Sequence, residues 1–142
     1  MDKHSYNVSL NWKEGRQGIM SSSVLNSQIE VATPPEFDKG VPGIWSPEHL
    51  FTASVVSCFM TTFLAIAEFS KLEFETLDCE AEGVLDKVDG KFMMTEINLK
   101  AKLKINDLEK AEKAERIMHK SEAACLISNS ITTKVNLSCE VS

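Results

Sequence analysis

The sequence predicts an α+β protein in which antiparallel β-sheets are wrapped around a buried central helix and a second long helix. Residues 50–67 carry no charge and are apolar on nearly every face, which is typical of a helix buried all round. Residues 93–105 alternate between apolar and polar side chains, as a strand with one wet face does. The predicted order β-β-β-α-β-β-α-β lacks the strand–helix alternation of a parallel sheet.

The N-terminal part predicts three strands followed by a loop. Residues 6–12 alternate in polarity and predict a strand with one buried face, and the polar residues 13–18 predict a turn. Two short strands are expected within 19–23 and 24–31, and residues 33–42, with three prolines, predict a loop. The apolar residues at the end of this region either form a flap over the core or simply pack on it: Phe37, Val41, Ile44 and Trp45.

A helix is expected to start at Ser46-Pro47-Glu48. Serine caps free N–H groups, proline fits the first helical position, and an acid is favourable near the positive end of the helix dipole. The uncharged run that follows is slightly short for a membrane span, has acids at both ends and contains hydroxyl side chains. A central helix wrapped by sheets, with a partner subunit covering what one small chain cannot, is the preferred interpretation.

The C-terminal half predicts a hairpin, a helix and a strand. Alternation over 77–105, interrupted by the turn D-K-V-D-G-K at 86–91, predicts a long antiparallel hairpin. A second helix is expected to be capped by either Asn106 or Asp107 and to continue to about Ala124 or a little beyond. Residues 131–141 alternate again and predict the final strand.

Length and composition limit the class of protein. The 142 residues predict a single domain covering 1–142. The formal net charge of −6, without a basic cluster, argues against nucleic acid and anionic membranes as partners. No signal peptide is visible, so we expect a cytoplasmic protein whose four cysteines are thiols rather than a disulfide framework. Their spacing does not suggest a zinc site.

Two of the cysteines are candidates for chemistry. Cys58 lies midway along the central helix, and Cys125 closes the inward stripe of the second helix, so the two sulfurs could meet. Cys79 and Cys139 are expected on buried strand faces, where cysteine usually behaves as a small hydrophobe. Packing remains the alternative for all four.

A reactive thiol in an apolar helix needs a nearby cation, because burial raises its pKa. Arg16, in the turn E-G-R-Q-G, is the candidate, and Glu48 at the mouth of the central helix is the acid that would hold it. The alternative is a solvated arginine and an ordinary acid at a helix start.

Four motifs resemble the OsmC/Ohr family of osmotically induced and organic hydroperoxide resistance proteins. They are G-R-Q-G-I-M-S-S (15–22), S-P-E-H-L-F (46–51), V-S-C-F (56–59) and A-A-C-L-I-S-N-S (123–130), and the similarity extends over nearly the whole chain. This chain departs from the family pattern at Ser46, at Val56-Ser57 and at Leu126-Ile127, which bears on the subfamily and the preferred peroxide.

The resemblance implies a thiol peroxidase that reduces organic hydroperoxides without metal, flavin or haem. It assigns Cys58 as the peroxidatic thiolate, Cys125 as the resolving thiol, Arg16 as the activating cation and Glu48 as the acid that orients Arg16. It also implies recycling by an external dithiol and an intertwined homodimer with active sites at the subunit interface. An unbroken helix places Glu48 and Cys58 roughly 15 Å apart, so we expect at least one member of the Arg16–Glu48 pair to come from the other subunit.

Two other functions are alternatives to this one. A non-enzymatic, dimeric, stress-related module would bind a small apolar ligand in the same interface, with inert or redox-sensing cysteines. A metal hydrolase is less consistent with the sequence, because His4 is near the terminus, His119 points away from the apolar stripe and only His49 lies near the proposed site.

Overall fold

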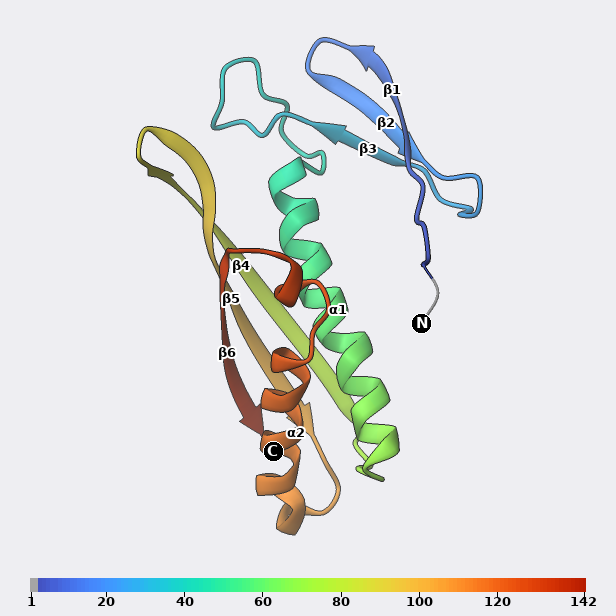
Figure 1. Ribbon diagram of the computed structural model, residues 1–142, viewed down its shortest axis with the longest axis vertical. Coiled ribbons are helices and arrows are strands. Elements are labelled where there is room, and N and C mark those ends of the chain that lie inside the picture. Colours follow the sequence, from blue (N-terminus) through green and yellow to red (C-terminus); the bar gives the residue numbers. More distant parts are fainter. Residues whose placement is uncertain (1–2) are drawn as a thin grey trace. The chain divides into compact units, whose positions relative to one another are not determined.

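The computed structural model describes residues 3–142 and contains two three-stranded sheets and two α-helices (Figure 1). The chain divides into two compact units, one ending at Leu50 and one beginning at Phe51, and each is described by itself. The order of strands and α-helices is the predicted one. The elements are β1 (Ser9–Glu14), β2 (Gln17–Ser21), β3 (Ile29–Ala32), α1 (Pro47–Phe69), β4 (Thr76–Val88), β5 (Lys91–Lys104), α2 (Ala111–Ala123) and β6 (Lys134–Val141), with short 3₁₀ turns η1 (Leu108–Lys110) and η2 (Ser128–Ser130).

The first unit is an antiparallel sheet in the order β1-β2-β3. β1 and β2 are joined by a tight turn at Gly15, whose φ of 51° suits glycine. Residues 24–28 do not continue a strand, so β3 is shorter than predicted. The sequence also predicted that one face of β1 is buried. For this chain by itself that prediction is wrong, because all six residues of β1 are exposed.

Helix α1 begins as predicted at the Ser46 cap. The Ser46 side chain is fully buried, and its hydroxyl oxygen accepts a hydrogen bond from the backbone N–H of His49 at 3.1 Å. Only one stripe of the helix is fully buried, namely Val55, Phe59, Phe63 and Ala67. The prediction of burial all round is therefore wrong for one chain, because the sheet of the second unit covers a single side.

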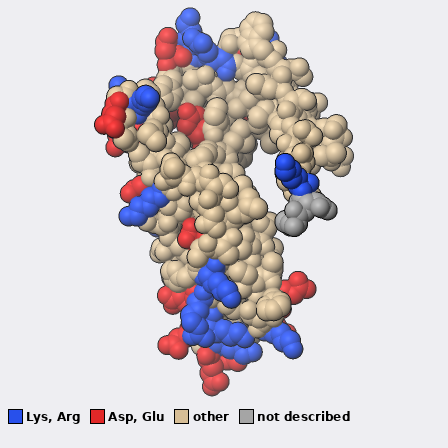
Figure 2. All heavy atoms as spheres, in the orientation of Figure 1, with Lys and Arg blue, Asp and Glu red and all other residues tan. Residues whose placement is uncertain are grey.

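The opposite face of α1 stays accessible although it is mostly apolar. Met60 and Leu64 are both 42% exposed, and the surface around the helix carries few charged side chains (Figure 2). By length and composition alone, α1 is also the one helix within residues 3–142 that could span a membrane. The buried stripe of α1 packs against the sheet of the second unit and against α2.

The sheet of the second unit is built on the long β4–β5 hairpin. Asp89 and Gly90 form its turn with φ values of 51° and 80°, the left-handed conformation that two-residue hairpin turns require. β6 pairs with β5 in parallel, which differs from the predicted antiparallel pairing. The connection through α2 crosses from one end of the sheet to the other, and such a crossover allows parallel pairing.

Helix α2 lies on this sheet through the predicted stripe. Ala114, Ile117, Met118 and Ser121 are buried, and they join the core formed by α1 and by Ile97, Leu99, Ala101 and Leu103 of β5. Asp107 caps the short turn η1 before α2 by accepting a hydrogen bond from the backbone N–H of Glu109 at 3.1 Å. Both helices therefore present one face to the same core (Figure 1).

Candidate functional site

The second unit brings the two candidate cysteines together. Cys58 lies midway along α1, one residue before the buried Phe59, so its side chain lies beside the buried stripe and is half-buried. Cys125 follows the C-terminus of α2, is fully buried, and its backbone N–H bonds to the carbonyl of Glu122 at 3.1 Å. The Cys125 thiol donates a hydrogen bond to the Cys58 sulfur, and both cysteines are unbridged thiols.

The Cys58 sulfur accepts several hydrogen bonds that favour its ionised form. Partial burial alone would raise the pKa of the Cys58 thiol, but the hydrogen bonds outweigh that effect and lower the pKa from its ordinary value of 9.0. The donors are the backbone N–H of Ile127, the thiol of Cys125, the hydroxyl of Thr62 and the backbone N–H of Leu126. The Thr62 oxygen lies 3.9 Å from the sulfur. A thiolate with these donors is a candidate nucleophile.

The segment after Cys125 folds as a helical turn that presents these amides. The N–H of Asn129 bonds to the Cys125 carbonyl at 3.0 Å, and the Ser130 hydroxyl donates to the Leu126 carbonyl at 2.8 Å. Burial raises the pKa of the Cys125 thiol, the Ser128 hydroxyl and backbone N–H oppose that rise, and Cys58 adds to it. Cys125 is therefore the protonated member of the pair, which suits a donor to a neighbouring thiolate.

The other two cysteines form a contrasting pair on the sheet. Cys79 of β4 and Cys139 of β6 are opposite the same residue of β5, Ala101, and both are half-buried. Burial, Glu115 and Cys79 raise the pKa of Cys139 to about 11, and burial with Asp78 raises the pKa of Cys79. A thiol with a raised pKa is a poor nucleophile. That both thiols are inert stays a prediction, which their raised pKa values favour.

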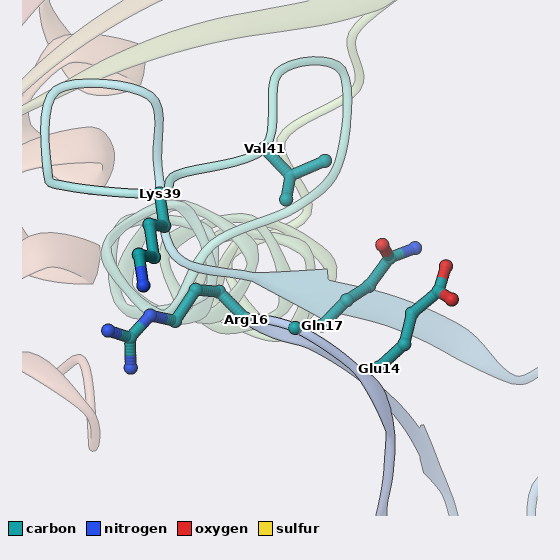
Figure 3. A pocket seen from close by; sticks show the side chains of 6 residues that line it. Glu14, Arg16, Gln17, Lys39 and Val41 are labelled. Atoms are coloured by element: carbon teal, nitrogen blue, oxygen red, sulfur yellow. The ribbon is translucent and has the colours of Figure 1, made fainter.

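Arg16 belongs to the first unit, where it follows the turn between β1 and β2 and is exposed. It forms no salt bridge within residues 3–142. An open hollow of about 530 Å³ in this unit is lined by Glu14, Gly15, Arg16, Gln17, Lys39 and Val41. Figure 3 shows that the side chains of Arg16 and Lys39 extend to the same side, whereas those of Glu14 and Gln17 extend to the other.

Glu48 lies in the first turn of α1 and is half-buried, with one carboxylate oxygen shielded from solvent. Beside it, the Ser46 hydroxyl lies 2.7 Å from Nδ1 of His49, whose ring meets Trp45 edge-on at 6.2 Å between centroids. Glu48 and Cys58 share one unbroken helix, as the sequence predicted. Their separation along the axis is therefore about 15 Å.

The sequence did not point to the other groups on Cys58. Thr62 is four positions after Cys58 on a helix, and the i, i+4 rule could have identified it as a neighbour. The amides of Leu126 and Ile127 have no side-chain signature, so no motif could have identified them. Within residues 3–142, no three His, Cys, Asp or Glu side chains are grouped so as to hold a metal ion.

Two sheets, two α-helices and a facing pair of thiols, one on α1 and one just after α2, define an α+β protein with a two-cysteine site. The model of the OsmC-like protein family matches residues 40–140, and this chain belongs to that family. The whole chain is similar to the uncharacterized protein YmaD of Bacillus subtilis strain 168, at 26% identity over 145 residues that cover 100% of this chain and 96% of YmaD. Peroxiredoxin OsmC of Escherichia coli K12 is 28% identical over 127 residues, covering 88% of this chain and 85% of that protein.

Solved structures agree with this assignment. An OsmC-like protein of unknown function from Vibrio cholerae has a TM-score of 0.85 at 25% identity, covering 98% of this chain and 99% of that one. An organic hydroperoxide resistance protein OsmC from Legionella pneumophila has a TM-score of 0.71 at 26% identity, covering 99% of each chain. These matches confirm the predicted fold class.

Proposed function

We propose that this protein is a thiol peroxidase that reduces organic hydroperoxides through Cys58 and Cys125. The proposal rests on one observation: the Cys58 sulfur faces the Cys125 thiol, and the hydrogen bonds that the sulfur accepts lower the pKa of the Cys58 thiol. The names of two relatives, a peroxiredoxin and an organic hydroperoxide resistance protein, support the same reaction class. A binding module without catalysis has no need for a stabilised thiolate beside a second thiol.

The reaction begins when the Cys58 thiolate attacks the outer oxygen of the hydroperoxide. The S–O bond forms as the O–O bond breaks, Cys58 becomes a sulfenic acid, and the alkoxide leaves as an alcohol after taking a proton. The Cys125 sulfur then attacks the sulfenic sulfur, which forms the Cys58–Cys125 disulfide and releases water. An external dithiol reduces the disulfide by two exchange steps and returns both thiols. The cycle uses no cofactor.

Arg16 and Glu48 complete the proposed site. A guanidinium beside Cys58 would stabilise both the thiolate and the charge that develops on the leaving oxygen. Glu48 would hold that guanidinium by a bidentate ion pair. Because Glu48 and Cys58 are about 15 Å apart on the same helix, one arginine cannot easily touch both within one chain. At least one of the three groups therefore comes from a second copy.

The exposed apolar surface supports a homodimer. In residues 3–50, large apolar side chains stand in solvent on or beside the strands of the first unit: Tyr6, Val8, Leu10, Trp12, Val24, Leu25, Ile29 and Trp45. Large exposed apolar patches on soluble proteins often mark protein–protein contact surfaces. Ala32 is the one hydrophobic residue of this described segment that is buried. A second copy would supply the missing core, and it would also cover the accessible face of α1.

A competition between cysteines tests the reaction. The reduced protein is treated with cumene hydroperoxide and dimedone, and sulfenic acid is measured at each cysteine by peptide mass spectrometry. We expect Cys58 to react at least about tenfold faster than Cys79, because only its thiolate is stabilised. The lowered pKa keeps Cys58 ionised as the pH falls below 9.0, so its advantage should grow toward neutral pH. If Cys58 is oxidised no faster than Cys79, the proposal that the protein is a peroxidase is refuted.

Mixing subunits tests the origin of Glu48. Chains carrying Cys58→Ser are unfolded and refolded with chains carrying Glu48→Gln, and hydroperoxide reduction is measured. If Glu48 serves the Cys58 of the partner, each mixed dimer holds one intact site, and about a quarter of wild-type activity should return.

The matched control for subunit mixing combines Cys58→Ser chains with Cys125→Ser chains. Cys58 and Cys125 meet within one chain, so this mixture should recover no turnover. If the mixture of Cys58→Ser and Glu48→Gln chains is equally inactive, this result counts against a site in which Glu48 of one subunit serves Cys58 of the other.

A further inference from the structure

In the proposed cycle, Cys125 must change from a hydrogen-bond donor to a nucleophile. In the reduced protein its thiol donates a hydrogen bond to the Cys58 sulfur, and burial raises the pKa of Cys125. In the second step the Cys125 sulfur attacks, and a thiol attacks as its thiolate. Cys125 is fully buried, so its thiolate needs a hydrogen-bond donor within the protein.

The Ser128 side chain lies beside this sulfur. Ser128 is three residues after Cys125 in the helical turn that follows α2, and residues three apart in such a turn lie on the same side. The hydrogen bond from the N–H of Asn129 to the Cys125 carbonyl, at 3.0 Å, holds the turn in this conformation. The hydroxyl and the backbone N–H of Ser128 both act on the Cys125 sulfur, and both favour its ionised form.

In the reduced protein the Ser128 hydroxyl is an unused donor. Its oxygen is shielded from solvent, and no group within residues 3–142 forms a well-aligned hydrogen bond with it. Leaving a buried hydroxyl without a partner costs free energy. The sulfur of a neutral thiol is only a weak acceptor, whereas a thiolate is a strong one. The Ser128 hydroxyl therefore gains a strong partner when Cys125 loses its proton.

The other two serines of α2 and of the turn after it already have partners. The Ser121 hydroxyl donates to the Ile117 carbonyl at 2.6 Å, and the Ser130 hydroxyl donates to the Leu126 carbonyl at 2.8 Å. Ser128 is thus the one serine of these two segments whose hydroxyl is not committed to a backbone carbonyl.

We propose that Ser128 activates Cys125 for the resolving step: its hydroxyl donates a hydrogen bond to the Cys125 sulfur as that sulfur attacks the Cys58 sulfenic acid. This inference rests on the proposed function and adds a residue to its site. The S–S bond forms as the S–O bond of the sulfenic acid breaks, and the proton that Cys125 loses combines with the departing hydroxide as water. Ser128 keeps its own proton and stays unchanged.

A mixed disulfide at Cys58 tests this inference without any hydroperoxide. One equivalent of methyl methanethiosulfonate converts the Cys58 thiol to a methyl disulfide. The Cys125 thiolate then attacks the Cys58 sulfur, forms the Cys58–Cys125 disulfide and releases methanethiolate. Loss of the methylthio group from the Cys58 peptide is timed by acid quenching and mass spectrometry. Ser128→Ala should slow this loss about tenfold, the effect of one hydrogen bond to a charged group.

Two variants of equal shape separate the hydroxyl of Ser128 from the size of the side chain. Ser128→Thr keeps the hydroxyl and should react within about twofold of the wild-type rate, whereas Ser128→Val lacks it and should be as slow as Ser128→Ala. Loss of the donor raises the pKa of Cys125, so the pH at which the rate is half-maximal should rise by about one unit. Cys58, the titratable group that acts on Cys125, is blocked in this assay and does not titrate.

Ser130→Ala is the matched control, because Ser130 belongs to the same turn but its hydroxyl bonds to the Leu126 carbonyl. It should change the rate by less than about twofold and leave the half-maximal pH unchanged. The inference is overturned if Ser128→Ala or Ser128→Val keeps the wild-type rate. It is also overturned if Ser130→Ala causes the same loss, because the effect then comes from the shape of the turn.

The same variants distinguish failure of this inference from failure of the proposed function. With cumene hydroperoxide, Ser128→Ala should form Cys58 sulfenic acid at the wild-type rate and convert it to the disulfide about tenfold more slowly. A Cys58 that does not react with the hydroperoxide would refute the peroxidase. Methanethiolate release would still show whether Ser128 activates Cys125, because that assay uses no hydroperoxide.

Discussion

A Cys58→Ser variant is expected to lose more than about a thousandfold in the rate of hydroperoxide reduction, because a serine hydroxyl is not ionised near neutral pH and cannot replace the thiolate. The structure supplies four donors to an ionised sulfur at this position, and the Cys125 thiol is one of them. The rate is measured by stopped-flow consumption of cumene hydroperoxide with excess dithiol. The fold should be retained, since serine is nearly the size of cysteine.

Cys139→Ser is the matched control for Cys58→Ser. Cys139 is also half-buried, but burial, Glu115 and Cys79 raise its pKa to about 11, so it should contribute nothing to the reaction. The Cys139→Ser rate is expected to stay within about twofold of the wild-type rate. A Cys139→Ser loss comparable to that of Cys58→Ser would place the reactive thiol on the sheet and contradict the proposed site.

A Cys125→Ser variant is expected to react once and then stop turning over with a bulky dithiol as reductant. The first attack needs only Cys58, so the hydroperoxide is still cleaved, and a sulfenic acid remains because no resolving thiol follows it. Rapid quench and mass spectrometry should find about one equivalent of alcohol and dimedone-reactive Cys58. The first-step rate should fall by less than about tenfold, because one of several hydrogen-bond donors is altered rather than all.

The outcome that contradicts this assignment is full turnover of Cys125→Ser with the same dithiol. In that case Cys58 sulfenic acid would be reduced directly, and Cys125 would act only as a donor. A Cys79→Ser variant serves as the control, because Cys79 lies on β4 and is not among the donors to Cys58. It should turn over normally.

The fold could be predicted where a single sequence pattern has a single physical cause. The alternation over 93–105 identified β5, because one face of that strand packs on both helices and the other meets water. The Ser46 cap was equally predictable, because few side chains can accept the free N–H groups of a helix start. In these segments the sequence pattern that gives the prediction is complete within a few neighbouring residues.

The features that could not be predicted depend on partners far away in the sequence. The direction of β6 relative to β5 is set by the crossover through α2 and not by the residues of β6. The alternation in β1 indicates that one face of the strand is suited to burial. The pattern does not say which surface covers that face, and within this chain β1 is exposed. The donors to Cys58 include two backbone amides, which every residue except proline carries.

The turn after α2 serves both sulfurs, and this has a consequence for the oxidised protein. Leu126 and Ile127 direct their N–H groups at Cys58, and the preceding residue is Cys125 itself. Once the two cysteines are joined, the anion that attracted those amides no longer exists. In the proposed cycle, the disulfide would then hold this loop to Cys58 in place of the hydrogen bonds to the thiolate, so the reductant would meet a different local surface from the one that the hydroperoxide would meet.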